Sequence, residues 1–210
     1  MRSFISKFLL LGSLFFSLSL FSQKEKAFEV YGEGVRAFYA QEYDLAIEKY
    51  NTALELHPNM IPALFNRGLT FSKQNKVDLA SYDFIRVIAL DSNYVEAYYQ
   101  LGKLEMDRKE YDKAYKHLRA GLLISPFHNK SLHLMGVLFF YQRKYKEANL
   151  IYNQLIEQDS KDDMAYYKRG ICYYNLMDFE TAIKDFTKAI ELNENNSSAI
   201  EQRAESYLSL

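Results

Sequence analysis

Four histidines and one cysteine are the side chains best suited to metal binding or nucleophilic chemistry in this 210-residue sequence. The histidines are His57, His117, His128 and His133. No two of them stand four residues apart on one helical face beside a carboxylate, which is the spacing that a helical metal site needs. Cys172 lies within the apolar stretch 171–174, where a free cysteine usually acts as a small buried hydrophobe. The sequence therefore predicts no metal site and a packing role for Cys172.

Motifs for phosphate binding or acyl transfer are also missing from the sequence. It has neither a glycine-rich phosphate loop nor a nucleophile elbow. Two acidic pairs, Asp162-Asp163 and Glu191/Glu194, fall at the ends of the repeating units described below, where solvated loop or helix-capping residues are usual. We therefore expect a protein that is not an enzyme, needs no cofactor and takes no small-molecule substrate.

Composition narrows the fold class and the kind of partner. The 26 Lys and Arg nearly balance the 27 Asp and Glu, so the basic surface typical of a nucleic-acid binder is not expected. Hydrophobic residues make up 49% of the chain, enough for a folded core. Only three Pro and eight Gly are present, too few for the many tight turns of a β-sandwich. The composition favours helices joined by short loops.

The N-terminal segment reads as a cleavable signal peptide. Arg2 and Lys7 precede an uncharged, mostly apolar run of residues 8–21, and Ser22 follows it. This run is shorter than the roughly 20 apolar residues that a membrane-spanning helix needs. We expect residues 1–22 to be removed and the mature chain, residues 23–210, to be exported.

A glycine recurs at a constant interval along the rest of the chain. The five glycines are Gly34, Gly68, Gly102, Gly136 and Gly170, each 34 residues after the last. An alanine follows each of them after twelve residues, and a large apolar side chain follows each alanine after four. Each unit contains two amphipathic runs of about 14 residues with helical spacing. A fixed period near 34 indicates a stack of helical hairpins.

This lattice resembles the tetratricopeptide repeat, whose pattern is Leu-Gly-x-x-Tyr, then Ala-x-x-x-Phe, and then Pro. The predicted repeats are residues 27–60, 61–94, 95–128, 129–162 and 163–196, followed by a half repeat that forms a terminal cap helix at 197–210. Ser197 or Ser198 is the expected N-cap of that last helix. The resemblance implies an all-α, right-handed α-solenoid superhelix of stacked antiparallel hairpins. The turn inside each hairpin lacks the glycine common in the family, and a positive φ there would cost roughly 1 kcal/mol for each non-glycine residue.

The resemblance also implies a concave groove lined by positions 2, 5, 6, 9, 12 and 13 of each repeat. The residues that it assigns to partner binding are Tyr31, Val35, Phe38, Phe65, Asn66, Leu69, Tyr99, Gln100, Lys103, His133, Val137, Phe140, Tyr167, Lys168, Ile171 and Tyr174. Tyrosine at positions 5 and 12 is common in the family and reflects packing as much as binding. The ninth position, where the family often has Asn, is apolar in every repeat except at Lys103.

The family's carboxylate clamp for chaperone C-termini is not expected here. The first three repeats place Tyr31, Val35, Asn66, Glu96 and Gln100 at the clamp positions, and only Asn66 matches. A glutamate in that ring would oppose a bound carboxylate.

The sequence therefore predicts an exported scaffold or adaptor of a bacterial envelope complex, periplasmic or outer-membrane-associated, that binds an apolar segment of a partner protein in its groove. The alternative is a periplasmic holdase-like chaperone that binds many clients weakly.

Overall fold

The computed structural model describes residues 22–210. The predicted signal peptide lies outside the described residues except for Ser22. Contacts divide the chain into two compact units, one ending at Ala97 and the other running Tyr98–Leu210.

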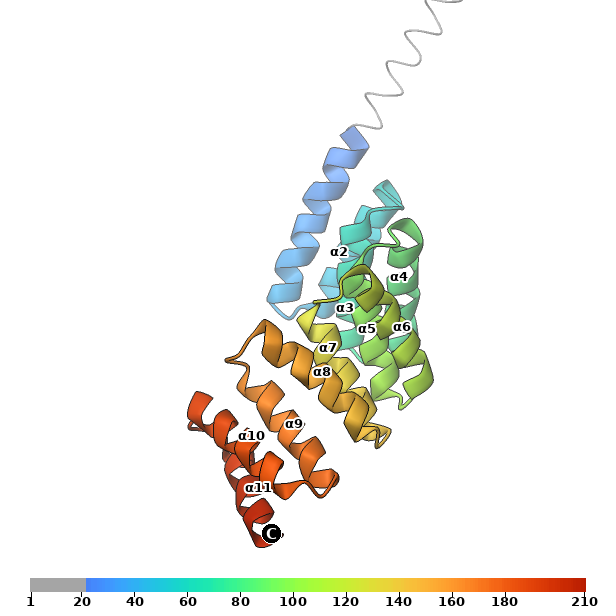
Figure 1. Ribbon diagram of the computed structural model, residues 1–210. Coiled ribbons are helices and arrows are strands. Elements are labelled where there is room, and N and C mark those ends of the chain that lie inside the picture. The colour runs from blue at the N-terminus through green and yellow to red at the C-terminus, as the bar shows by residue number, and fades with distance from the viewer. Residues whose placement is uncertain (1–21) are drawn as a thin grey trace, which may run out of the picture. The chain divides into compact units, whose positions relative to one another are not determined.

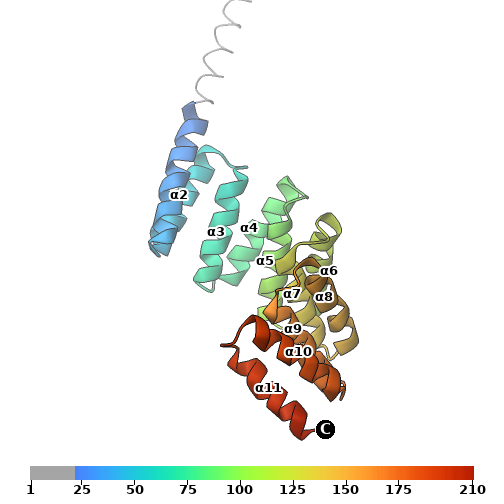
Figure 2. The ribbon, with the colours of Figure 1, turned by 60° about the vertical axis from the view of Figure 1, so that its left-hand side comes forward.

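Helices with short connections make up both units (Figure 1). The first unit contains a helix at residues 22–39, then α2 (Tyr43–Leu56), α3 (Ile61–Lys73), α4 (Val77–Leu90) and the first residues of α5 (Val95–Asp107). The second unit contains the rest of α5, then α6 (Tyr111–Ile124), α7 (Asn129–Tyr141), α8 (Tyr145–Gln158), α9 (Asp163–Asn175), α10 (Phe179–Leu192) and α11 (Ser197–Leu208). Figure 2 shows α3 beside α4, and α9 beside α10 and α11, in agreement with their contacts. The described residues are thus all-α.

The helices keep the 34-residue register of the sequence. First helices of successive hairpins begin at Ile61, Val95, Asn129, Asp163 and Ser197, and second helices begin at Tyr43, Val77, Tyr111, Tyr145 and Phe179. From α2 to α10 the first helices have 13 residues and the second helices 14, in agreement with the two amphipathic runs expected in each unit, while α11 has 12. The exact repeat boundaries stay a prediction.

The recurring glycines lie where the two helices of a hairpin approach most closely. A Cβ added to Gly68 would stand 2.8 Å from the Phe84 ring, and one added to Gly170 would stand 2.8 Å from the Phe186 ring. The alanines of the lattice, such as Ala80 and Ala182, are fully buried. The glycine positions therefore require a residue without a side chain, because a large apolar side chain from the second helix occupies the space.

The turn inside each hairpin has a left-handed residue. Within residues 22–210, five residues have a positive φ, between 59° and 64°: Gln41, Asn75, Lys109, Arg143 and Met177. Only Gly, and to a lesser degree Asn, adopts this conformation at low cost. Four of the five turns therefore carry backbone strain that the packed helices hold in place.

A buried ion pair joins the two helices of one hairpin, and its arginine also bonds to the preceding hairpin. Arg169 on α9 donates two hydrogen bonds to Asp185 on α10, at 2.6 and 2.7 Å, and a third to Asn153 on α8 at 2.6 Å. Asp185 is only 5% exposed, and the hydrogen bonds to it raise the pKa of Arg169. Arg67 and Asp83 form the same arrangement in the first unit.

The N-cap expected for α11 is wrong by one residue. The cap is Asn196, whose side chain accepts a hydrogen bond from Ala199 N at 3.0 Å. Asn caps a helix about as well as Ser does, and the helix begins at Ser197, so neither Ser197 nor Ser198 lies outside it.

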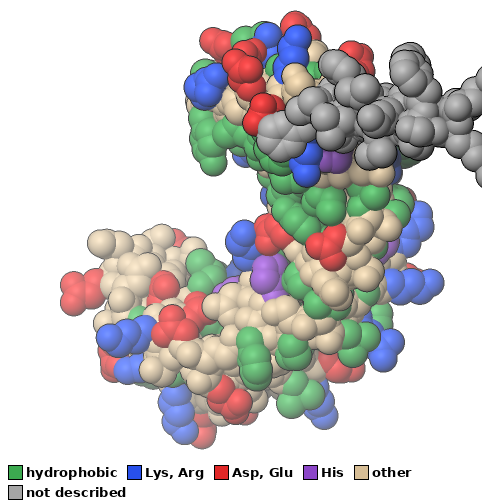
Figure 3. Space-filling model, turned by 90° about the horizontal axis from the view of Figure 1, so that it is seen from above, with side chains coloured by type: hydrophobic (Ala, Val, Ile, Leu, Met, Phe, Trp, Pro, Cys, Tyr) green, Lys and Arg blue, Asp and Glu red, His purple; other side chains and the backbone are tan. Residues whose placement is uncertain are grey.

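Acidic and basic side chains are interspersed on the face shown in Figure 3, in keeping with the balanced composition. None of the helices within residues 22–210 is long and apolar enough to cross a membrane.

Candidate partner-binding groove

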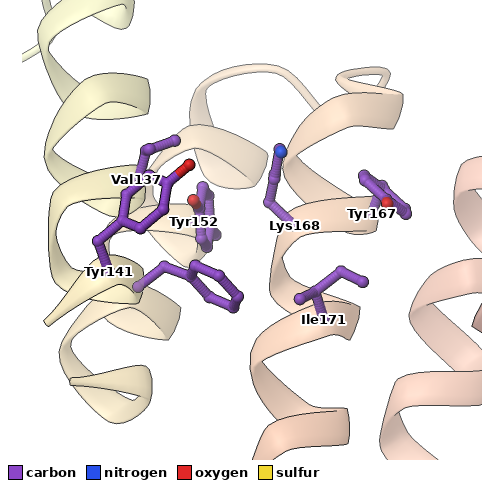
Figure 4. Close-up of a pocket in the computed structure, with 7 residues that line it drawn as sticks. Val137, Tyr141, Tyr152, Tyr167, Lys168 and Ile171 are labelled. Atoms are coloured by element: carbon purple, nitrogen blue, oxygen red, sulfur yellow. The ribbon is translucent and has the colours of Figure 1, made fainter. Parts of the chain in front are cut away.

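Two neighbouring first helices of the second unit present matching rows of side chains. Phe140 and Tyr141 lie three and four residues after Val137 on α7, so both are neighbours of Val137 on the helix surface. On α9, Ile171 likewise lies four and three residues after Tyr167 and Lys168. Figure 4 shows Val137 and Tyr141 on the side of α7 that faces Lys168 and Ile171.

A cavity of about 210 Å³ lies between these rows. Its lining consists of Val137, Phe140, Tyr141, Tyr152, Tyr167, Lys168 and Ile171. We call it the aromatic pocket, because four of the seven lining residues carry aromatic rings.

A second and more open cavity, of about 420 Å³, adjoins the first. Its lining consists of Tyr99, Lys130, His133, Leu134, Val137, Met164 and Lys168. We call it the basic pocket, because it contains two lysines. Val137 and Lys168 line both cavities, so the two pockets form one continuous depression, here called the groove.

The floor of the aromatic pocket is buried and chemically inert. Tyr152 is 1% exposed and lies against the Cα of Gly136, and its burial raises its pKa. Beside the groove, burial raises the pKa of the Cys172 thiol to about 12, although the charge of Lys168 opposes this effect. A thiol with such a pKa is protonated at neutral pH and is a poor nucleophile, which agrees with the packing role expected for Cys172.

The charged groups of the groove are cationic. Lys130 Nζ lies 5.8 Å from the centre of the Tyr99 ring, and Lys168 Nζ lies 5.5 Å from the centre of the Tyr167 ring. Neither pocket is lined by Asp or Glu.

His133 is held by a carboxylate behind the groove. Its Nε2 lies 2.9 Å from Asp162 Oδ2, while the same carboxylate caps α9 by accepting a hydrogen bond from Ala165 N at 2.9 Å. Asp162 is a helix cap as expected, and it also fixes the position of a groove residue. Across residues 22–210, no three His, Cys, Asp or Glu side chains are grouped to hold a metal ion.

Seven of the predicted partner-binding residues come together in the groove. They are Tyr99, His133, Val137, Phe140, Tyr167, Lys168 and Ile171. Three others of the second unit, Gln100, Lys103 and Tyr174, do not line either pocket. The Tyr174 ring instead packs against Phe179, with ring centres 5.3 Å apart.

The predicted residues of the first unit form a separate group. Tyr31, Val35, Phe38 and Leu69 are partly exposed, and Asn66 donates a hydrogen bond to the Tyr31 hydroxyl at 2.8 Å. Phe65 departs from the prediction. It is only 8% exposed because its ring packs against Phe84 and Tyr94, so Phe65 belongs to the core and offers no anchor to a partner.

Five groove residues are not among those assigned to partner binding from the sequence: Lys130, Leu134, Tyr141, Tyr152 and Met164. Four of them occupy positions 2, 6 or 13 of their repeats, so the positional pattern itself points to Lys130, Leu134, Tyr141 and Met164. Tyr152 comes from a second helix and reaches the groove only because Gly136 leaves room above its ring. The large apolar position 16 residues after each glycine is its only signal in the sequence.

Family models match most of the chain. The tetratricopeptide repeat is matched at residues 164–196, and related models of the same repeat match residues 34–75, 95–128 and 130–162.

Similar proteins carry the same repeat. Tetratricopeptide repeat protein 13 of Homo sapiens is 23% identical over 154 residues, which are 71% of this chain and 18% of that protein. This chain therefore spans less than a fifth of that relative's length.

Two solved structures share the fold. The MamA protein gives a TM-score of 0.73 at 22% identity, covering 83% of this chain and 95% of its own. YrrB, described as a TPR protein with an unusual peptide-binding site, also gives 0.73, at 19% identity, covering 90% of this chain and 97% of its own.

Proposed function

Because this chain belongs to the tetratricopeptide repeat family, we propose that it is a non-enzymatic protein–protein interaction scaffold that binds an apolar segment of a partner in the groove. One observation carries the proposal. The aromatic and basic pockets are continuous through Val137 and Lys168, and their walls are mainly aromatic and aliphatic. Such a surface is stabilised when an apolar side chain displaces water from it.

The groove residues are of the types that dominate binding energy at protein interfaces. Tyr141 is 61% exposed at the edge of the aromatic pocket, while Phe140 is held by the Tyr145 ring at a centre distance of 5.5 Å. Aromatic side chains that are fixed before binding lose little conformational entropy on association. The peptide-binding site described for YrrB, which has the same fold, supports this use of the surface.

We place this scaffold in a bacterial cell envelope, as an exported adaptor of an envelope complex. The support is the basic then apolar N-terminal segment, with Arg2 and Lys7 before an uncharged run. The matching human protein is far longer than this chain, so the complex and its partners are part of the proposal.

Site-specific photocrosslinking in the native cell envelope tests the groove directly. A photoreactive phenylalanine analogue would replace Tyr141, which lines the aromatic pocket, or Tyr207, which lies on α11 outside both pockets. The two tyrosines are matched because they are 61% and 59% exposed. Substitution at such exposed positions leaves the fold intact.

The adaptor proposal predicts one dominant crosslinked protein from position 141 and no such product from position 207. A ladder of many weak products from position 141 would instead favour the holdase-like chaperone. Crosslinking to the same protein from position 207 alone would move the binding site away from the groove.

A further inference from the structure

We propose that the segment bound in the groove carries an internal Asp or Glu side chain, flanked on both sides by apolar residues, whose carboxylate binds Lys168. This inference rests on the proposed function, because it specifies the chemistry of the segment that occupies the same groove.

Lys168 carries a positive charge that no carboxylate of the described chain pairs with. Its Nζ makes a cation–π contact with the Tyr167 ring at 5.5 Å, and no ion pair joins it to an acidic residue within residues 22–210. Other lysines of this chain, such as Lys49 with Glu33 and Lys113 with Glu110, do form ion pairs. Lys168 is also half-buried, so a bound segment would remove more water from it.

A segment bound in the groove removes water from the ammonium group of Lys168, and this loss of water determines which segments bind well. A purely apolar segment that covered Lys168 would bury an ammonium group without an acceptor, which opposes binding. A carboxylate at the same place would instead form a charge-assisted hydrogen bond in a water-poor setting. Neither pocket is lined by an acidic residue, and Asp162, which contacts the groove residue His133, already binds that histidine and caps α9, so the acceptor comes from the partner.

The position of Lys168 decides where in the partner segment the acid lies. Lys168 lines both the aromatic and the basic pocket, so it stands at the junction between two apolar sites. A segment that fills both pockets must run past Lys168 in both directions. The carboxylate is therefore that of a side chain within the segment rather than the C-terminus of the partner.

Selection from a random peptide library tests this inference. The library would display 12-residue random peptides between constant linkers, so that no selected peptide has a free C-terminus. Selection would use the wild-type protein, Lys168→Glu and the control Lys184→Glu, which changes an exposed lysine on α10 outside both pockets. Fluorescence anisotropy would then compare each consensus peptide with its counterpart in which Gln or Asn replaces the acid.

We expect wild-type and Lys184→Glu to select apolar peptides with one central acid, and Lys168→Glu to select peptides with Lys or Arg in its place. Neutralising the acid should weaken binding to wild type about tenfold or more. Selection of apolar peptides without an acid, or of the same acidic consensus by Lys168→Glu, would overturn the inference and leave the groove proposal standing. If no selected peptide loses affinity on Tyr141→Ala, the groove proposal fails, and the inference fails with it.

Discussion

Gly136 on α7 lies directly over the ring of Tyr152 on α8, so that a Cβ added to the glycine would stand 2.7 Å from Tyr152 Cζ. The ring is 1% exposed and cannot turn away into solvent. The contact between Gly136 and Tyr152 belongs both to the packing of the hairpin and to the groove, because Tyr152 also lines the aromatic pocket.

Gly136→Ala should therefore destabilise the protein, although alanine is the better helix former. Overpacking costs about 1–3 kcal/mol, against a propensity gain of at most about 1 kcal/mol. Gly32→Ala is the matched control, because a Cβ there meets only the flexible end of Arg36 at 3.7 Å. Thermal unfolding followed by circular dichroism should give a lower Tm for Gly136→Ala and an equal or higher Tm for Gly32→Ala. A rise in Tm for both would show that the close approach is absent.

The left-handed turn residues offer a stabilising substitution. Met177 has a φ of 62° and is 78% exposed, so its replacement disturbs no packing. Met177→Gly should stabilise the protein by about 0.5–1 kcal/mol, because glycine adopts this conformation without a steric cost. Asn75→Gly should change stability less, because Asn tolerates the left-handed region better than Met. Urea unfolding measures both, and a loss of stability in Met177→Gly would contradict the strain argument.

The Arg169–Asp185 pair should affect the free energy of unfolding far more than an exposed ion pair does. Arg169→Met leaves the carboxylate of Asp185 buried without its cation, which costs about 3–5 kcal/mol. The double substitution Arg169→Met with Asp185→Asn removes that buried charge and should recover part of the loss. Lys188, which pairs with Glu191 on the surface at 3.1 Å, is the control, since Lys188→Met should change little. Chemical unfolding would compare wild type, Arg169→Met, the double variant and Lys188→Met. Equal losses of unfolding free energy in Arg169→Met and Lys188→Met would contradict the prediction.

Alkaline pH should destabilise the second unit through Cys172. Its pKa is raised from 9.0 to about 12 by burial, so the thiol ionises more readily in the unfolded chain than in the folded one. The stabilising contribution is complete below pH 9 and is lost as the pH rises toward 12, by up to about 1.4 kcal/mol per pH unit. Unfolding free energies measured between pH 8 and pH 10.5 should fall more steeply for wild type than for Cys172→Ala. Parallel curves would mean that the thiol is accessible in the folded protein.

The periodicity of the sequence predicts the helices well because the fold repeats a local unit. A glycine, an alanine and a large apolar residue at fixed spacings specify each hairpin contact, as Gly170 and Phe186 illustrate. The strained turn is predictable for the same reason, because each hairpin needs one left-handed residue at the same position. The sequence does not identify Asn196 as the N-cap of α11, because Asn196, Ser197 and Ser198 follow one another and Asn and Ser cap helices about equally well.

The groove is less predictable because position in the repeat does not determine exposure. Phe65 and Tyr167 both occupy the fifth position, yet Phe65 is covered by Tyr94 while Tyr167 lines the aromatic pocket. The difference comes from the side chain that follows the second helix, which varies among repeats. The His133–Asp162 contact joins the fifth and last positions of one repeat, as the Phe65–Tyr94 contact does, so the nature of the contact depends on which side chains those two positions carry.

The most direct test of the groove is the affinity of the partner recovered by crosslinking at position 141, measured by isothermal titration calorimetry with purified components. Tyr141→Ala should weaken binding at least about tenfold, as loss of an aromatic anchor does, while the equally exposed Tyr207→Ala should bind as wild type does. Unchanged affinity in Tyr141→Ala, with weakened binding in Tyr207→Ala, would contradict the account.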